Sequence, residues 1–150
     1  MILELPDAAA TEALGARLAQ SITPGIVYLQ GDLGSGKTTL TRGLLRGLGH
    51  QGKVRSPTYT LVEPYRFDDC AVYHLDLYRL AEPEELEWLG LRDMLAERAL
   101  LLVEWPERGA GVLPAADLVI QLEYAGPGRR AMLDAASSAG EQLLEKVAVP

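Results

Sequence analysis

The segment that most constrains this chain runs from Gly31 to Thr38 and reads GDLGSGKT. It satisfies all four fixed positions of the phosphate-binding loop pattern G-x-x-x-x-G-K-[ST]. At average residue usage, those positions coincide by chance in roughly one of a few hundred chains of this length. The segment therefore predicts a site that holds the phosphates of a nucleoside triphosphate.

The residues on either side of this loop predict the order that such a site requires. Residues 26–30, before the loop, are apolar, β-branched and aromatic, as in a buried strand. After the loop, Leu40, Leu44 and Leu45 recur at helical spacing. We therefore expect a strand that ends at the loop and a helix that begins at Lys37.

The residue types in the loop suit the charge of a polyphosphate. Glycines at 31, 34 and 36 allow successive N–H groups to point inward at phosphate oxygens, and the following helix adds its positive end. Lys37 is expected to reach the β- and γ-phosphates, and the Thr38 hydroxyl to bind Mg²⁺. The loop positions predicted to line the nucleotide are Gly31, Asp32, Leu33, Gly34, Ser35, Gly36, Lys37, Thr38 and Thr39.

Length and composition favour a single domain over residues 1–150. The net charge of −7 repels a nucleic-acid backbone, so direct binding along a nucleic acid is not expected. No apolar run approaches the ~18 residues that a membrane helix needs. The first residues lack the basic and apolar stretches of a signal peptide. We therefore predict a cytoplasmic protein without a membrane partner.

Helical and strand patterns alternate along the chain and predict a three-layer α/β fold. The expected sheet is that of a P-loop NTPase-like domain: mixed, mostly parallel in its centre, with antiparallel hairpins on one side. We expect helices through 11–19 (capped by Asp7), 37–46, 83–86, 91–98 and 140–147, and strands over 26–30, 61–65, 71–78, 99–105, 118–124 and 130–133.

Two carboxylates stand where buried strands are expected to end. Asp76 comes late in one strand, and Glu104 is the first charged residue after five apolar ones. Ligands of such sheets lie at the carboxyl ends of the strands. Either acid could bind Mg²⁺ or orient an attacking water, so both are candidate catalytic residues and metal ligands, alongside Lys37 as a catalytic residue. A capping or salt-bridge role is the alternative, and His74 is interpreted as a strand filler.

Residues 56–60, Ser-Pro-Thr-Tyr-Thr, form a hydroxyl-rich segment stiffened by proline. We interpret it as a loop that closes on the γ-phosphate and senses its loss; an ordinary turn into the next strand is the alternative. Trp105 is expected over the nucleotide, against a partner, or in the core. No Asn-Lys-x-Asp motif is present to select guanine, so ATP is the expected nucleotide.

Four blocks taken together, 31–40, 56–62, 74–79 and 104–108, resemble the bacterial TsaE (YjeE) family, and the likeness runs from the first strand to about Tyr124. Members are small cytoplasmic P-loop ATPases needed to make threonylcarbamoyladenosine, the modified base beside the anticodon of tRNAs that read codons beginning with A. The resemblance implies that this chain binds the TsaD–TsaB pair, which transfers the group to tRNA. ATP hydrolysis would reset that pair between turnovers, and tRNA would be reached only through the complex.

The resemblance also implies roles for single residues. Lys37 and Thr38 would hold the phosphates and Mg²⁺. Glu104 would be a metal ligand, and Asp76 would assist hydrolysis. The other positions that it places near the nucleotide are Ser56 and Thr58, as a nucleotide-sensing loop, and Trp105, Asp7 and Arg129. The tail beyond Arg130 departs most from the family pattern.

Two other functions stay open from the residues alone. The first is a small phosphotransferase on the same loop, which would need a lid with arginines that clamp the acceptor; only Arg92, Arg98 and Arg108 are scattered candidates. The second is a binding module that responds to nucleotide and whose hydrolysis is incidental.

Overall fold

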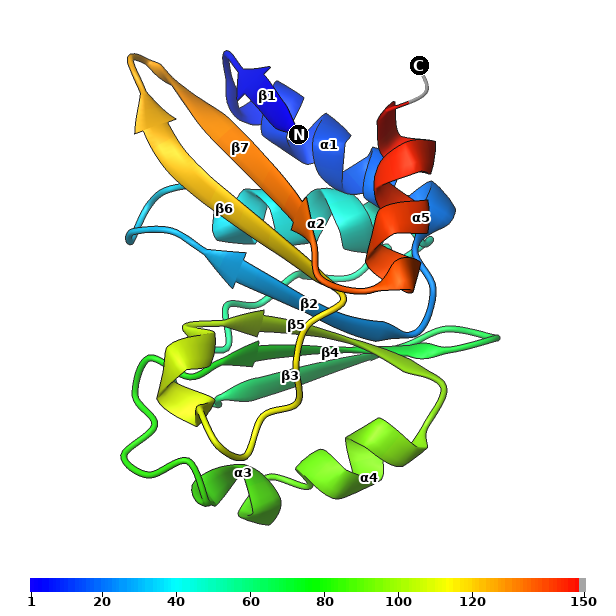
Figure 1. The fold of residues 1–150 in the computed structure, drawn as a ribbon, viewed down its shortest axis with the longest axis vertical. Helices are drawn as coiled ribbons and strands as arrows, with labels where there is room; N and C mark the ends of the chain where they lie inside the picture. Colours follow the sequence, from blue (N-terminus) through cyan, green and yellow to red (C-terminus); the bar gives the residue numbers. More distant parts are fainter. Residues whose placement is uncertain (149–150) are drawn as a thin grey trace.

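The strand that precedes the phosphate loop, β2 (Gly25–Gln30), is the middle strand of a seven-stranded sheet in a computed structural model that describes residues 1–148 (Figure 1). The strand order is β1-β7-β6-β2-β5-β4-β3. Parallel pairing joins β6 to β2, β2 to β5 and β5 to β4. The other strands are β1 (Ile2–Leu5), β3 (Val62–Arg66), β4 (Ala71–Asp76), β5 (Ala99–Glu104), β6 (Leu118–Ala125) and β7 (Gly128–Ala135).

The predicted mixed α/β sheet with parallel central strands is confirmed, but antiparallel pairs border both edges rather than one side. The β3–β4 hairpin forms one edge. At the other edge, β7 pairs with β6 and also with β1, where Ile2 lies opposite Met132 and Leu5 opposite Arg129. Strand β1 was not expected, because four residues carry little intrinsic strand preference and the free edge of β7 supplies the pairing.

Helices cover both faces of the sheet, as a three-layer fold requires. Alternate residues of β5 divide between the two cores: Leu100 and Leu102 face one, Leu101 and Val103 the other. In Figure 1, α1, α2 and α5 lie in the upper half, and α3 and α4 lie below β3–β5. The helices are α1 (Ala8–Ser21), α2 (Lys37–Gly47), α3 (Glu85–Trp88), α4 (Leu91–Ala96), the 3-10 helix η1 (Pro106–Gly109) and α5 (Ser138–Ala148).

The phosphate-loop helix α2 crosses α1 with its backbone in direct contact. A Cβ on Gly43 would lie 2.0 Å from the carbonyl oxygen of Glu12, and one on Gly15 would lie 2.2 Å from that of Leu40. Only glycine fits at such a crossing, because any side chain would force the helices apart. The crossing therefore fixes where α2, and with it Lys37, lies relative to the sheet.

No helix among residues 1–148 has both the length and the apolar character needed to cross a membrane. The longest helix, α1, has 14 residues.

Candidate functional site

The phosphate loop leaves β2 and enters α2 at Gly36, which has a φ of 109°. This left-handed backbone is costly for residues that carry a Cβ. The carbonyl of Gly36 accepts the first helical hydrogen bond, from the Leu40 amide at 2.9 Å. The strand, loop and helix therefore follow one another as the sequence predicts, with the amino end of α2 at the loop.

Lys37 is buried at the base of the loop. Its Nζ donates to the carbonyl oxygen of Gly31 at 2.6 Å and lies 3.5 Å from Oε1 of Glu104. It also lies 4.6 Å from the ring centroid of Trp105, within the range of a cation–π contact. The Lys37 ammonium is thus surrounded by the Gly31 carbonyl, the Glu104 carboxylate and the Trp105 indole.

Glu104 is also buried, and its second oxygen is held by a histidine. Oε2 of Glu104 lies 2.6 Å from Nε2 of His74, which is fully buried. His74 lies inside β4, as the interpretation as a strand filler expects, and its ring also contacts an acidic residue of the site, which that interpretation did not include. The spacing of His74 and Asp76 places both on one face of β4, but it does not indicate the contact with Glu104, which depends on the pairing of β4 with β5.

Asp76 lies beside Glu104 because the two are register partners in the parallel strands β4 and β5. Its Oδ1 accepts a hydrogen bond from the Tyr78 amide at 3.0 Å, and its Oδ2 accepts one from the Thr58 hydroxyl at 3.3 Å. The predicted position of each acid at the carboxyl end of a buried strand is confirmed, and the register of β4 against β5 brings the two side by side. Their catalytic and metal-binding roles stay predictions.

The hydroxyl-rich segment reaches this edge through Thr58. The Ser56 and Thr58 hydroxyl oxygens lie 2.8 Å apart, so Ser56, Thr58 and Asp76 form a continuous hydrogen-bonded chain. Ser56 is exposed, while Asp76 is buried. The segment is therefore tied to the acidic edge at one end and open to solvent at the other.

The oxygen donors near the loop suit a small hard cation. Thr38 follows Lys37 in the first turn of α2, and Asp76 and Glu104 supply two carboxylates. Mg²⁺ usually takes one or two carboxylates and completes its octahedron with phosphate oxygens and water. Within residues 1–148, no group of three or more His, Cys, Asp or Glu side chains forms a metal cage. The donor set therefore fits Mg²⁺ held jointly with phosphates.

A pocket of about 250 Å³ lies on the α1 side of the loop, and we call it the hairpin pocket. Arg129 of β7 donates from Nε to the Ser35 carbonyl and from Nη2 to the Gly34 carbonyl, both at 3.1 Å. The Tyr124 hydroxyl donates to the Leu33 carbonyl at 2.9 Å. The β6–β7 hairpin thus holds the loop from outside. The lining includes Asp7, Thr11, Gly34, Gly36, Thr39 and Arg129.

The hairpin pocket brings together Asp7, Thr39 and Arg129, three of the predicted nucleotide-lining residues, from different parts of the chain. Asp7 also caps α1, because its Oδ1 accepts from the Ala10 amide at 2.8 Å. Tyr124 was missed as a functional residue, since a tyrosine late in a strand carries no motif. Of the remaining predicted loop residues, Asp32 and Leu33 are exposed and Ser35 is buried.

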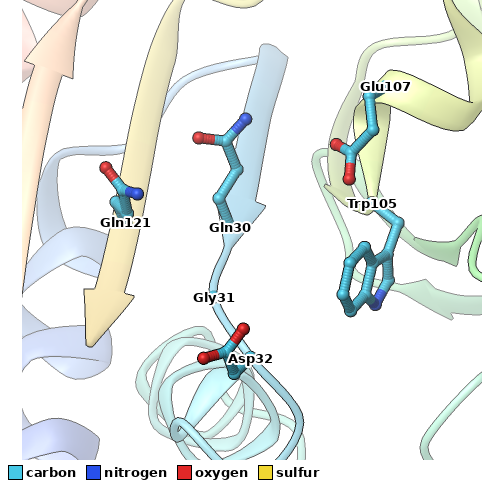
Figure 2. A pocket seen from close by; sticks show the side chains of 6 residues that line it. All are labelled: Gln30, Gly31, Asp32, Trp105, Glu107 and Gln121. Carbon is cyan, nitrogen blue, oxygen red and sulfur yellow. The ribbon is translucent and has the colours of Figure 1, made fainter. Parts of the chain in front are cut away.

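A second pocket, of about 320 Å³, lies on the opposite side of the loop, and we call it the glutamine pocket. Figure 2 shows Gln30 of β2 beside Gln121 of β6, with Asp32 at the loop and with Trp105 and Glu107 across the gap. Gln30 and Gln121 are register partners in these parallel strands. Sequence reasoning missed Gln30, Gln121 and Glu107, because the pairing of β2 with β6 brings the glutamines together and the turn after β5 places Glu107 in η1 opposite them.

Trp105 lines this pocket and also contacts the Lys37 ammonium, and its backbone is strained. Its φ of 56° and ψ of 50° are left-handed, which is rare for a bulky residue. Its indole contacts the Tyr78 ring at a centroid distance of 5.1 Å and lines the glutamine pocket. Trp105 packs against the core and also contacts Lys37 of the phosphate loop, and its placement over a nucleotide or against a partner stays a prediction.

Known proteins share this sequence and fold. A family model described as "Threonylcarbamoyl adenosine biosynthesis protein TsaE" matches residues 5–132. A tRNA threonylcarbamoyladenosine biosynthesis protein TsaE from Haemophilus influenzae is 52% identical over 119 residues, which cover 79% of this chain and 75% of that protein. One of the same name from Bacillus subtilis is 38% identical over 121 residues, covering 80% and 75%. A crystal structure of Bacillus subtilis YdiB aligns with a TM-score of 0.84 at 30% identity, covering 98% of this chain and 93% of that one.

Proposed function

This chain belongs to the TsaE family of tRNA threonylcarbamoyladenosine biosynthesis proteins, and we propose that it serves that pathway as a Mg²⁺-dependent ATPase that acts on the TsaD–TsaB pair. The observation that carries the proposal is the phosphate loop, whose Lys37 ammonium lies 3.5 Å from Glu104 at the edge shared with Asp76. A loop of this pattern binds the phosphates of a nucleotide. Carboxylates beside it are the groups that hold a metal or orient water.

In this proposal each side chain at the loop has one task. Lys37 exchanges its contact with the Gly31 carbonyl for phosphate oxygens, and Thr38 and Glu104 supply oxygens to Mg²⁺. When bound, Mg²⁺ neutralises charge that develops on the phosphates. Asp76, held by the Tyr78 amide and the Thr58 hydroxyl, orients the water that attacks the γ-phosphorus.

The Ser56–Thr58 segment is proposed to report the state of the nucleotide. Its side-chain link to the acidic edge is the hydroxyl-to-carboxylate contact of 3.3 Å between Thr58 and Asp76, and its backbone is joined to the same edge through Leu61, whose carbonyl accepts from the Asp76 amide. The side-chain contact can be broken without unfolding a strand. Such a loop would transmit the loss of the γ-phosphate to a bound protein. This is the step by which hydrolysis would reset the TsaD–TsaB pair.

The base and sugar of the nucleotide are assigned to the hairpin pocket, which contains Asp7 and Arg129. The pocket lies against Gly34 and Gly36 of the loop, so a nucleotide bound there would extend its phosphates along the loop toward Lys37. The net charge of −7 agrees with a protein that acts through other proteins and reaches tRNA only through the complex. We propose that this takes place in the cytoplasm.

The proposal is tested by ATP hydrolysis and complex formation in one preparation. The purified chain should release phosphate from Mg-ATP slowly alone and faster with the TsaD–TsaB pair, and it should be retained by that pair in a pull-down with ATP. Failure to bind the pair with or without ATP would contradict the assignment of partner. Label from γ-labelled ATP that moves to a nucleoside or sugar would instead favour a phosphotransferase.

If hydrolysis were incidental to nucleotide-dependent binding, Lys37→Ala would abolish retention by the pair. Threonylcarbamoyladenosine formation would then fall only in proportion to the lost binding. Under the proposal, a variant that still binds but does not hydrolyse, such as Asp76→Ala, should fail to support repeated turnover of the pair.

A further inference from the structure

The glutamine pocket is acidic and is not neutralised from within the chain. Asp32 and Glu107 place carboxylates at its rim, Gln30 and Gln121 contribute carboxamides, and Trp105 gives one aromatic wall. No lysine or arginine lines it. The ion pairs of residues 1–148 include neither the Asp32 nor the Glu107 carboxylate. The pocket therefore presents negative potential and hydrogen-bond acceptors to whatever enters it.

The pocket borders the phosphate end of the nucleotide site. Gly31 lines it and accepts the hydrogen bond from Lys37 Nζ at 2.6 Å. Trp105 lines it as well and lies 4.6 Å from the same ammonium. In the proposed function Lys37 reaches the β- and γ-phosphates, so a group in the glutamine pocket would lie next to the phosphates and away from the hairpin pocket.

The lining selects a planar organic cation. The carboxylates repel a phosphate or another anion, and a hydrated metal ion would make no use of the indole wall. A guanidinium suits what is present, because it stacks on an indole and donates several hydrogen bonds in a plane to carboxylate and amide oxygens. An ammonium would gain less from the indole face and the paired amides.

We propose that the glutamine pocket receives an arginine side chain from the protein partner, and that the guanidinium completes the phosphate site of this chain. The identity of the partner rests on the proposed function; the chemistry of the pocket does not. The carboxylates of Asp32 and Glu107 oppose a nearby polyphosphate while the pocket is empty, and an inserted guanidinium offsets one of these two charges and brings its own N–H donors beside the phosphates. A cation supplied in this way stabilises the charge of phosphoryl transfer only when the partner is docked.

The first test measures activation by the partner. Glu107→Lys places a cation at the pocket rim, Glu107→Gln removes only the charge, and Glu145→Lys makes the same charge reversal at an exposed position of α5. The stimulation of each variant is measured relative to its own rate on ATP alone, because a change of charge beside the phosphates alters that rate as well. Stimulation by the TsaD–TsaB pair should fall at least tenfold in Glu107→Lys, less in Glu107→Gln, and not in Glu145→Lys.

The second test needs no partner and no hydrolysis. In a Trp88→Phe background, where Trp105 is the sole tryptophan, N-acetylarginine amide should quench the indole fluorescence at constant ionic strength. N-acetylcitrulline amide has nearly the same shape without the charge and should quench at least fivefold less. Glu107→Lys should remove the difference between the two probes, and Gln121→Leu should reduce it.

The two tests separate the inference from the function on which it rests. Normal stimulation of Glu107→Lys together with equal quenching by both probes would overturn the arginine pocket and leave the ATPase proposal intact. The arginine probe could also quench preferentially while the TsaD–TsaB pair neither binds nor stimulates the chain. That result would support a guanidinium site in the pocket and contradict the proposed partner. Equal quenching by both probes in wild-type protein would reject the pocket whatever the hydrolysis assay gives.

Discussion

Two groups of acidic side chains lie near Trp105: Glu104 with Asp76, and Glu107 with Asp32. The two groups differ in whether the chain itself supplies a partner for their negative charge. Glu104 is buried and contacts both Lys37 and His74, whereas Glu107 is exposed and forms no ion pair among residues 1–148. Burial of a charge without a partner is costly, so the fold itself must supply the partners of Glu104. An exposed carboxylate is solvated and needs no partner within the fold, so a cation on another molecule can pair with it. Under the two proposals made above, the buried group serves the chemistry and the exposed group serves recognition.

Among substitutions in the buried group and its contacts, Lys37→Ala should have the largest effect on ATP hydrolysis. It removes the cation that the buried group is arranged around, so we expect ATP hydrolysis to fall by about 100-fold or more, the scale of losing a preorganised electrostatic contact. Phosphate release at saturating Mg-ATP measures it, with circular dichroism to confirm folding. Lys53→Ala, at an exposed lysine, is the matched control. A variant that keeps a tenth of the wild-type rate would show that Lys37 is not the principal phosphate contact.

Glu104→Ala and Asp76→Ala come next. Each removes one of the two carboxylates at the shared strand edge, and each should lower hydrolysis at least about tenfold. Asp134→Ala, at an exposed carboxylate of β7, should leave the rate unchanged. Wild-type turnover in both edge variants would mean that other acids carry the chemistry.

His74→Phe should have a smaller effect on rate and a measurable one on stability. It leaves Oε2 of Glu104 without its buried partner, so the free energy of unfolding should fall by about 1–3 kcal/mol. Because Glu104 is then less well oriented, the Mg²⁺ concentration for half-maximal hydrolysis should rise severalfold. Urea unfolding and a Mg²⁺ titration measure the two quantities, and His50→Phe is the control. An unchanged Mg²⁺ dependence would reduce His74 to a packing role.

Thr58→Val should give the smallest change. It removes one hydroxyl contact to Asp76, and a hydrogen bond of this kind contributes about 0.5–1.5 kcal/mol, which corresponds to a rate loss of roughly two- to tenfold. Thr60→Val alters the same segment at a hydroxyl that contacts Glu63 instead. Steady-state hydrolysis compares the pair. Equal losses in both variants would indicate a general effect on the segment rather than a specific contact with Asp76.

Sequence patterns over a few residues predicted the helices, strands and turns that depend mainly on neighbouring residues. The strand before the loop, helix α2 and the β3–β4 and β6–β7 hairpins were expected near their observed positions, because periodicity and turn residues act within a few positions. Strand β1 was missed, since its four residues form a strand only against β7. The placement of hairpins on one side was wrong for the same reason: strand order depends on pairings between distant segments.

The candidate site divides in the same way. The loop, with Lys37 and Thr38, could be read directly, and the rule that ligands lie at strand ends found Asp76 and Glu104. The contact of His74 with Glu104 could not be predicted, because it depends on the register of β4 against β5. The meeting of Gln30 with Gln121 depends in turn on the register of β2 against β6.

The amino-acid sequence by itself determined that this chain carries a phosphate loop between a strand and a helix, because the glycines, lysine and threonine that build it are consecutive. Only the tertiary structure decided which side chains surround that loop. Arg129 and Tyr124 reach it from a hairpin, and Trp105 reaches it from a strained turn after β5. The physical reason is that parallel strands bring their carboxyl ends to one edge from positions far apart in the chain, and nothing local to those positions records which neighbours they meet.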